Sequence, residues 1–152
     1  MGVQGMVHAL ERAGGHLEPD GVLVLIQPHQ WKRQFIAITG SRKREPVAAL
    51  VNPVFQPFIN AAMAAIQTVV EKRRFTLIGS SHHQFRVHLT SQSELRRYLH
   101  LGQRPSRFAA GGRQRLNALW GKRRQGARIE VTEFLTVIGL RPDPTQAKAN
   151  AS

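Results

Sequence analysis

The stretch Val7–His29, VHALERAGGHLEPDGVLVLIQPH, decides the predicted fold, because it contains a helix, a turn and a strand in close succession. Apolar residues recur at three-residue steps at its start (Val7, Leu10 and Ala13), which is the period of a helix. Gly14-Gly15 follows, and glycine often ends a helix because it tolerates left-handed backbone angles. A short amphipathic helix is therefore predicted before the turn.

A strand is predicted immediately after the turn. Pro19-Asp20-Gly21 has the composition of a tight turn, and five apolar residues, Val22–Ile26, follow without alternation. Such a run is typical of a strand that is buried on both faces, as in a parallel sheet covered by helices. Pro28 then ends the strand.

This order of elements resembles the region around the fifth strand of class I S-adenosylmethionine-dependent methyltransferases. The matching residues are Ala9-Leu10-Glu11, Leu17, Pro19, Gly21 and Val22–Ile26. Two positions depart from the family pattern: Asp20 stands where the family usually has glycine, and Gly14-Gly15-His16 replaces basic and apolar residues.

The resemblance extends over most of the chain. It assigns Val22–Ile26, Phe75–Leu89 and Arg128–Leu140 to the fifth, sixth and seventh strands of that fold, with the last strand beside the fifth. The implied fold class is α/β: a partial Rossmann-like methyltransferase fold with three main strands in a mixed sheet, flanked by helices and lacking the N-terminal cofactor-binding strands. Residues 1–142 are predicted to form this half-domain, and residues 143–152 a disordered tail.

The intervening segments give further local predictions. Pro46–Arg74 contains the clearest predicted helix, with Pro57 suited to its first turn, and Arg113–Arg124 is predicted to form another. Ser91–Glu94 has the pattern of a capping box, which begins a helix. Gln34–Thr39 fits either a strand or a helical turn, and Met1–Gly5 is expected to be a frayed terminus.

The methyl donor has no recognisable binding loop in this sequence. Gly2-Val3-Gln4-Gly5 has two glycines, but no strand precedes them to aim backbone N–H groups at a ligand. S-adenosylmethionine is thus implied as the cofactor of the full-length family, and no cofactor is expected to bind this chain alone. The resemblance implies a truncated methyltransferase, or a misplaced start, with an unknown methyl acceptor. A complementing chain or a homo-oligomer would supply the missing strands.

Histidine and tryptophan provide the substrate-side candidates. His29 and Trp31 follow the central strand, where the resembling family places its substrate pocket; the alternative is a loop histidine and a surface aromatic. His82, His83 and His88 also suggest a metal site. Adjacent residues of a strand point to opposite faces, however, so His82 and His83 cannot both reach one ion, and no metal is predicted.

Charge suggests a different function. The formal net charge is +13, which is compatible with attraction to nucleic acid or another polyanion. The alternative is that arginine serves as a default surface residue, and the abundance of arginine over lysine favours this alternative. The alternative to an enzyme is a basic module that binds nucleic acid through Arg96–Arg124. The candidate anion-binding residues are Arg104, Arg107, Arg113, Arg115, Lys122, Arg123 and Arg124.

Composition limits the class of protein. With 152 residues and 41% apolar content, the chain can bury a core, and it is not typical of disordered proteins. The absence of cysteine excludes disulfides and thiolate metal sites, and no apolar stretch has membrane-spanning length. A cytoplasmic protein with no membrane association is expected.

Overall fold

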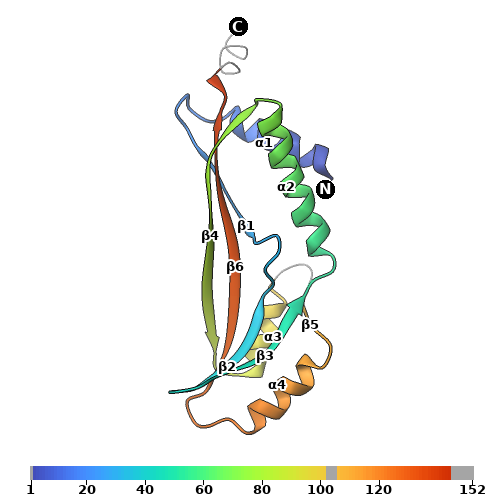
Figure 1. Cartoon of the computed structure of the whole chain (residues 1–152), viewed down its shortest axis with the longest axis vertical. Helices are drawn as coiled ribbons and strands as arrows, with labels where there is room; N and C mark the ends of the chain where they lie inside the picture. The colour runs from blue at the N-terminus through green and yellow to red at the C-terminus, as the bar shows by residue number, and fades with distance from the viewer. Residues whose placement is uncertain (1, 102–105, 145–152) are drawn as a thin grey trace. The chain divides into compact units, whose positions relative to one another are not determined.

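The computed structural model describes residues 2–101 and 106–144, and they form two compact units. Unit 1 comprises Met1–Gln30, Gln56–His83 and Leu135–Ser152, and unit 2 comprises Trp31–Phe55 and Gln84–Phe134. Two long strands, β4 (Phe75–Leu89) and β6 (Arg128–Pro142), contribute residues to both units (Figure 1).

In unit 1, the sheet consists of β1 (Leu23–Pro28) and the parts of β4 and β6 that belong to this unit. The β6 strand lies between the other two and is antiparallel to β1, with pairs from Leu23↔Leu140 to Pro28↔Leu135. Figure 1 shows that β4 also runs antiparallel to β6. The prediction that Arg128–Leu140 lies beside Val22–Ile26 is confirmed.

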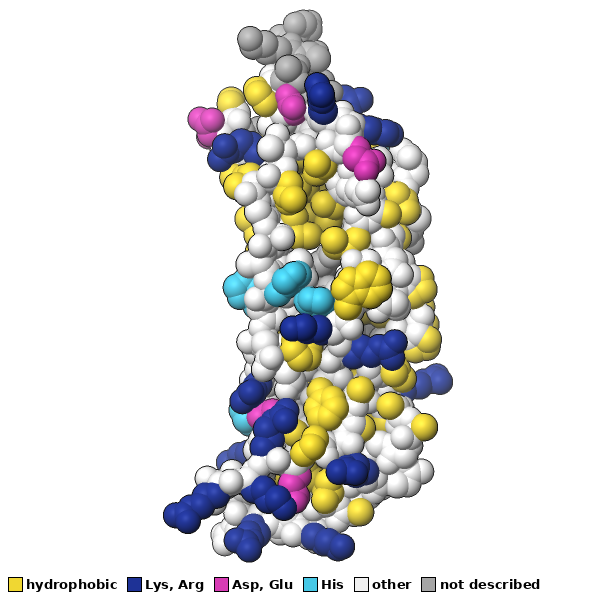
Figure 2. Space-filling view, viewed as in Figure 1, with side chains coloured by type: hydrophobic (Ala, Val, Ile, Leu, Met, Phe, Trp, Pro, Cys, Tyr) yellow, Lys and Arg dark blue, Asp and Glu magenta, His cyan; other side chains and the backbone are white. Residues whose placement is uncertain are grey.

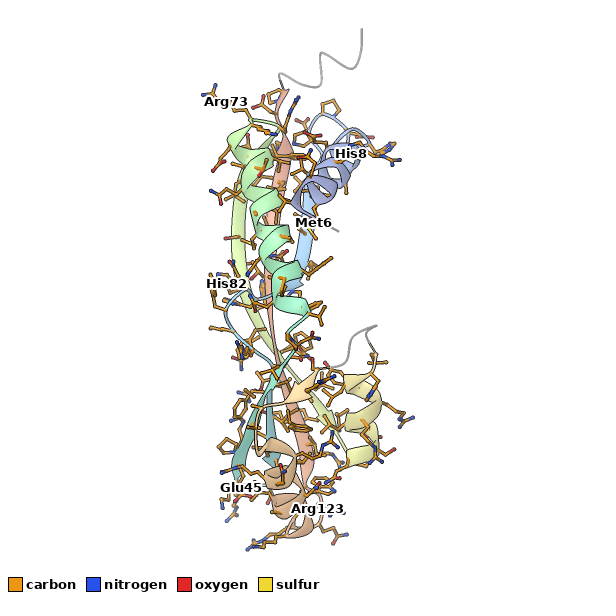
Figure 3. The ribbon with its side chains drawn as sticks, turned by 90° about the vertical axis from the view of Figure 1, so that its right-hand side faces the viewer. Met6, His8, Glu45, Arg73, His82 and Arg123 are labelled. Carbon is orange, nitrogen blue, oxygen red and sulfur yellow. The ribbon has the colours of Figure 1, made fainter. Side chains whose placement is uncertain are left out.

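Both helices of unit 1 contribute to one apolar core with this sheet. The helices are α1 (Val3–Gly14) and α2 (Phe55–Glu71). Their buried side chains pack with those of β4 and β6; the buried members are Met6, Val7, Ala65, Ile66, Val69, Phe75, Ile138 and Leu140. Met6 lies on α1 (Figure 3). Leu23 and Leu25 of β1 pack against the same cluster, so both helices lie on one face of the sheet.

The opposite face of β1 is bare among the described residues. Val24 is 56% exposed and Ile26 is 66% exposed, whereas their neighbours Leu23 and Leu25 are partly buried. The prediction that this strand is buried on both faces is therefore wrong, because the described helices cover only one face. The strand also ends the order β1-β6-β2-β3-β5, so no described strand pairs with its outer edge.

Unit 2 is built on an antiparallel sheet that the sequence did not reveal. The hairpin β2 (Phe35–Thr39) and β3 (Arg44–Val51) pairs with the first part of β6, from Phe35↔Thr132 to Thr39↔Arg128. The short β5 (Arg107–Phe108) extends the sheet beyond β3.

One face of the unit 2 sheet is covered by α3 (Gln92–Leu99) and α4 (Gly112–Gly121). Leu95 of α3 and Leu116 and Trp120 of α4 are buried in one cluster with residues of β2, β3 and β6. Ser91 caps α3 by accepting a hydrogen bond from the Glu94 N–H at 3.1 Å, so the predicted capping residue is confirmed. Glu94 reaches back to the Thr90 N–H instead of the Ser91 N–H.

The predicted fold class and the predicted start of the longest helix both require correction. The chain is α/β, but the six strands of its described residues form an antiparallel open sheet, not three main strands in a mixed sheet. The longest helix begins at Phe55, and residues 46–51 belong to β3 instead. A bulge between Ile36 and Ala37 lets Pro46, which has no N–H to donate, enter this strand.

The structure describes the start of the chain from residue 2, but only the first two residues of the predicted C-terminal tail. Residues 3–5, expected to fray, form the first turn of α1. Most of the predicted tail, residues 145–152, lies outside the described part of the chain. Within residues 2–101 and 106–144, no helix is both long enough and apolar enough to cross a membrane.

Candidate functional site

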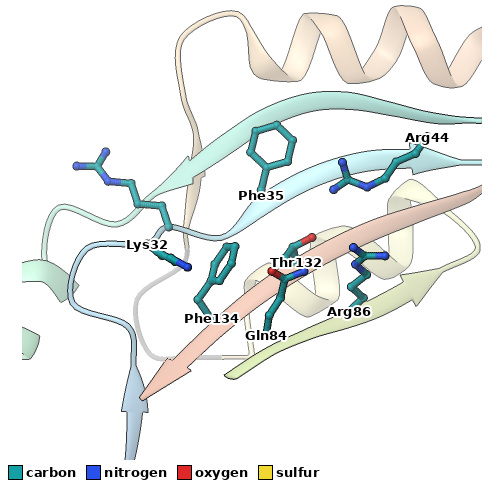
Figure 4. Close-up of a pocket in the computed structure, with 8 residues that line it drawn as sticks. Lys32, Phe35, Arg44, Gln84, Arg86, Thr132 and Phe134 are labelled. Carbon is teal, nitrogen blue, oxygen red and sulfur yellow. The ribbon is translucent and has the colours of Figure 1, made fainter. Parts of the chain in front are cut away.

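The face of the unit 2 sheet opposite α3 and α4 has a shallow cavity of about 490 Å³. Cationic, aromatic and amide side chains line it; they are Lys32, Arg33, Phe35, Arg44, Gln84, Arg86, Thr132 and Phe134. Figure 4 shows the two phenylalanine rings between Lys32 on one side and Arg44 and Arg86 on the other. We call these eight residues the basic–aromatic face.

Strand alternation explains why these side chains share one face. In β2, Ile36 and Ile38 enter the core beneath α3 and α4, so Phe35 points to the other side. In β6, Val131 is in the core, and Thr132, which pairs with Phe35, lies on the same side as that phenylalanine. The sheet thus presents one apolar face to its helices and one cationic, aromatic face away from them.

A buried carboxylate organises the cations of this face. Glu130 is only 2% exposed, and its Oε1 accepts a hydrogen bond from Arg44 Nε at 2.8 Å. Arg86 Nε lies 3.8 Å from the same oxygen, and the Thr132 hydroxyl donates to it at 3.4 Å. One carboxylate is therefore shared by two guanidinium groups. Because Arg44 and Arg86 are still 42% and 51% exposed, both retain surface that can contact an anion.

The aromatic part of the face is also close to a cation. Lys32 Nζ lies 5.5 Å from the centroid of the Phe134 ring, within the range of a cation–π interaction. Phe35 and Phe134 are both partly exposed and line the same cavity. Planar rings next to positive charges are the combination on which nucleobases stack while phosphates are held nearby.

Unit 2 carries nearly all of the excess charge. It has 16 of the 22 Lys and Arg residues but only 4 of the 9 Asp and Glu residues, a formal net charge of +12 out of +13. Figure 2 shows Lys and Arg side chains gathered around hydrophobic ones on the visible part of this unit. Arginine spread evenly as a default surface residue would not produce this division between the units.

Several of the predicted anion-binding residues contact other parts of unit 2. The Arg123 guanidinium lies 4.2 Å from the Trp120 ring centroid (Figure 3), and that of Arg113 lies 5.6 Å from the Phe108 ring centroid. Arg115 Nε donates to the Pro46 carbonyl at 3.2 Å. These cations lie on or next to α4, on the helix-covered side of the sheet.

The remaining predicted cations are exposed or outside the described residues. Arg107 lies in β5, and Lys122 and Arg124 follow α4; all three are exposed. Arg104 lies outside the described part of the chain.

The two substrate-side candidates, His29 and Trp31, belong to different units. In unit 1, the His29 ring centroid lies 4.6 Å from that of His82, and His82 Nδ1 is 3.1 Å from the Thr136 hydroxyl. In unit 2, Trp31 is 75% exposed. In the described residues, no group of three or more His, Cys, Asp or Glu side chains is placed to hold a metal ion.

A hydrogen-bonded network supports the sheet on its helix-covered side. Tyr98 donates to Glu133 Oε1 at 2.6 Å, and Gln34 Nε2 donates to the same oxygen at 2.7 Å. The Ser106 hydroxyl in turn donates to Gln34 Oε1 at 2.9 Å. Burial, followed by the hydrogen bond to Glu133, raises the pKa of Tyr98 well above its usual value of 10.0. The network joins α3 and β6 to the segment that leads into β2.

Reasoning from the sequence missed the basic–aromatic face. It left residues 34–39 undecided between a strand and a helical turn, and it named none of the eight residues of this face as a candidate. The alternation of Glu130 and Thr132 with Ile129 and Val131 was the available signal for a second, polar face. A comparison with known protein families, curated proteins and solved structures found no match to this chain.

Proposed function

We propose that the chain is the carboxyl-terminal part of a class I S-adenosylmethionine-dependent methyltransferase scaffold. The observation that carries the proposal is the strand order in unit 1, where β6 is inserted antiparallel between β1 and β4. The resembling fold has this order for its fifth, seventh and sixth strands. The hairpin β2–β3 and the helices α3 and α4 are then additions that enlarge the scaffold into unit 2.

The bare surfaces of β1 support the same proposal. A strand with two exposed apolar residues, Val24 and Ile26, a third just before it, Val22, and an unpaired outer edge is a liability for a protein in water. In a complete methyltransferase fold, further strands continue the sheet beyond the fifth strand, and helices cover its second face. The missing half of the scaffold would therefore cover the surfaces that are bare here.

Methyl transfer in this proposal requires residues that this chain lacks. Catalysis of an in-line displacement comes largely from holding donor and acceptor in position, so the half that binds the donor is essential. The chain alone should not bind S-adenosylmethionine. Micromolar binding of S-adenosylmethionine to the purified chain in titration calorimetry would contradict the proposal.

A chimeric protein provides the positive test. The strands and cofactor loop from the first half of a characterised class I methyltransferase would be joined in front of α1. We expect micromolar binding of S-adenosylmethionine and slower amide hydrogen exchange along β1 than in the chain alone. Val24→Lys in the chimera is the control, since a charge on the face to be covered should weaken both effects. A folded chimera whose β1 amides exchange as fast as before would reject the proposal.

The concentration of charge in unit 2 favours a second function, the binding of a polyanion. A net charge of +12 on one unit attracts phosphate polymers whether or not unit 1 belongs to an enzyme. Binding should weaken steeply with salt, because neutralised phosphates release counterions. Retention on heparin and on nucleic acid columns at low salt tests this function, and no retention on either would reject it.

A further inference from the structure

We infer that the basic–aromatic face of unit 2 binds single-stranded nucleic acid, with bases stacked on Phe35 and Phe134 and phosphates held by the surrounding cations. This inference rests on the proposed polyanion binding and specifies its surface and its ligand. It places the site on the bare side of the sheet and not among the cations of α3 and α4.

The shape of the surface favours single strands over a duplex. The cavity is shallow and lies on a sheet face that no described helix covers. Duplex bases are stacked on one another, so only their edges and the phosphates could contact such a face. Unpaired bases can instead lie flat on aromatic rings, an interaction that tolerates many sequences because every base has a π-face.

The cations of the face are held close to the rings. Arg44 and Arg86 are oriented by the buried Glu130 carboxylate, and Lys32 lies against Phe134. A phosphate bound there would exploit side chains that are already ordered, so less conformational entropy is lost on binding. The Gln84 amide, which also lines the cavity, can donate to or accept from a base edge.

Fluorescence anisotropy with labelled oligonucleotides tests the inference on the full chain. The probes are single-stranded RNA and DNA of mixed sequence, a DNA duplex of equal length, and unlabelled heparin as competitor. We expect both single strands to bind at least tenfold more tightly than the duplex at the same salt concentration. The two single-stranded probes distinguish RNA from DNA as the preferred source of the ligand.

Matched variants locate the site. Phe134→Leu removes the ring but keeps an apolar side chain, and it should weaken single-strand binding about tenfold while leaving heparin binding unchanged. The double variant R33Q/R86Q removes two cations from the face, and R113Q/R124Q removes the same number from the side of α4. The first should weaken binding at least fivefold more than the second. Thermal unfolding of each variant would verify that it is folded.

The outcomes separate this inference from the polyanion function on which it rests. If R113Q/R124Q weakens binding more than R33Q/R86Q, or if Phe134→Leu has no effect, the polyanion function survives and the assigned surface is wrong. Equal affinity for single strands and duplex also overturns the assigned ligand. If none of the probes binds at low salt, both proposals fail.

Discussion

Arg44 Nε donates to Glu130 Oε1 at 2.8 Å, and this pair connects β3 to β6 across the intervening β2. Because Glu130 is almost fully buried, its carboxylate is stabilised by contacts with protein groups and not by water. We expect Arg44→Ala to lower the free energy of unfolding by about 2 kcal/mol, measured by urea denaturation. Arg86→Ala should cost less, because its Nε is 3.8 Å from the same oxygen. Equal effects would contradict this ranking.

Tyr98 provides a prediction at high pH. Its raised pKa means that the folded protein keeps the phenolic proton while the unfolded chain loses it above pH 10. The unfolded state then binds fewer protons, so stability should fall as pH rises above 10. Tyr98 is the only tyrosine in the chain, so tyrosinate absorbance reports its titration directly. If Tyr98 loses its proton at the same pH in native buffer and in denaturant, the prediction is contradicted.

The hydrogen bond from Tyr98 to Glu133 can also be tested at neutral pH. Tyr98→Phe removes the hydroxyl with little change in packing, and we expect it to lower the free energy of unfolding by about 1 to 2 kcal/mol. The control is the same substitution in a Glu133→Gln background, where the partner no longer carries a charge. The loss should be smaller there, and an equal loss would show that the carboxylate is not responsible.

Glu94 provides the corresponding prediction at low pH. Hydrogen bonds from the Thr90 backbone N–H, at 2.6 Å, and then from its hydroxyl lower the pKa of this carboxyl below its usual value of 4.5. The folded state therefore releases the proton more readily than the unfolded state, and the stabilising contribution is lost as pH falls below 4.5. Glu94→Gln should flatten the dependence of stability on pH in that range. An unchanged slope in urea titrations at several pH values would contradict this prediction.

Substitutions at two adjacent residues of β1 test whether the face of this strand opposite the helices is bare. Val24→Lys places a charge on the exposed face, and we expect a change in the free energy of unfolding within about 0.5 kcal/mol. Leu25→Lys directs the same charge into the unit 1 core and should cost about 3 kcal/mol or more. Chemical denaturation compares them. Similar losses for both would mean that another part of a folded assembly covers Val24.

The helices could be predicted where residues that are close in sequence determine the structure. The apolar period of α2, its early Pro57 and the Ser91 cap each determine a helix through neighbours along the chain. The pairing of β6 with β1 was predicted from the resemblance, whereas its pairing with β2 was not.

The remaining features depend on contacts that are distant in sequence. Val22–Ile26 is uniformly apolar, so its pattern cannot reveal that only one face is covered by helices. Residues 46–51 contain a proline and small apolar residues, and they form a strand only because β2 and β5 pair with them on either side. The residues of the basic–aromatic face come from four separate segments, which are brought together by strand pairing.

The sharing of β6 between the two units has a consequence for how the protein unfolds. Residues 135–140 form a ladder with β1 in unit 1, and residues 128–132 form one with β2 in unit 2. Unfolding of this strand would remove the hydrogen-bonding partner of β1 in unit 1 and of β2 in unit 2. A heating scan should therefore give one cooperative melting transition, even though the chain has two separate hydrophobic clusters.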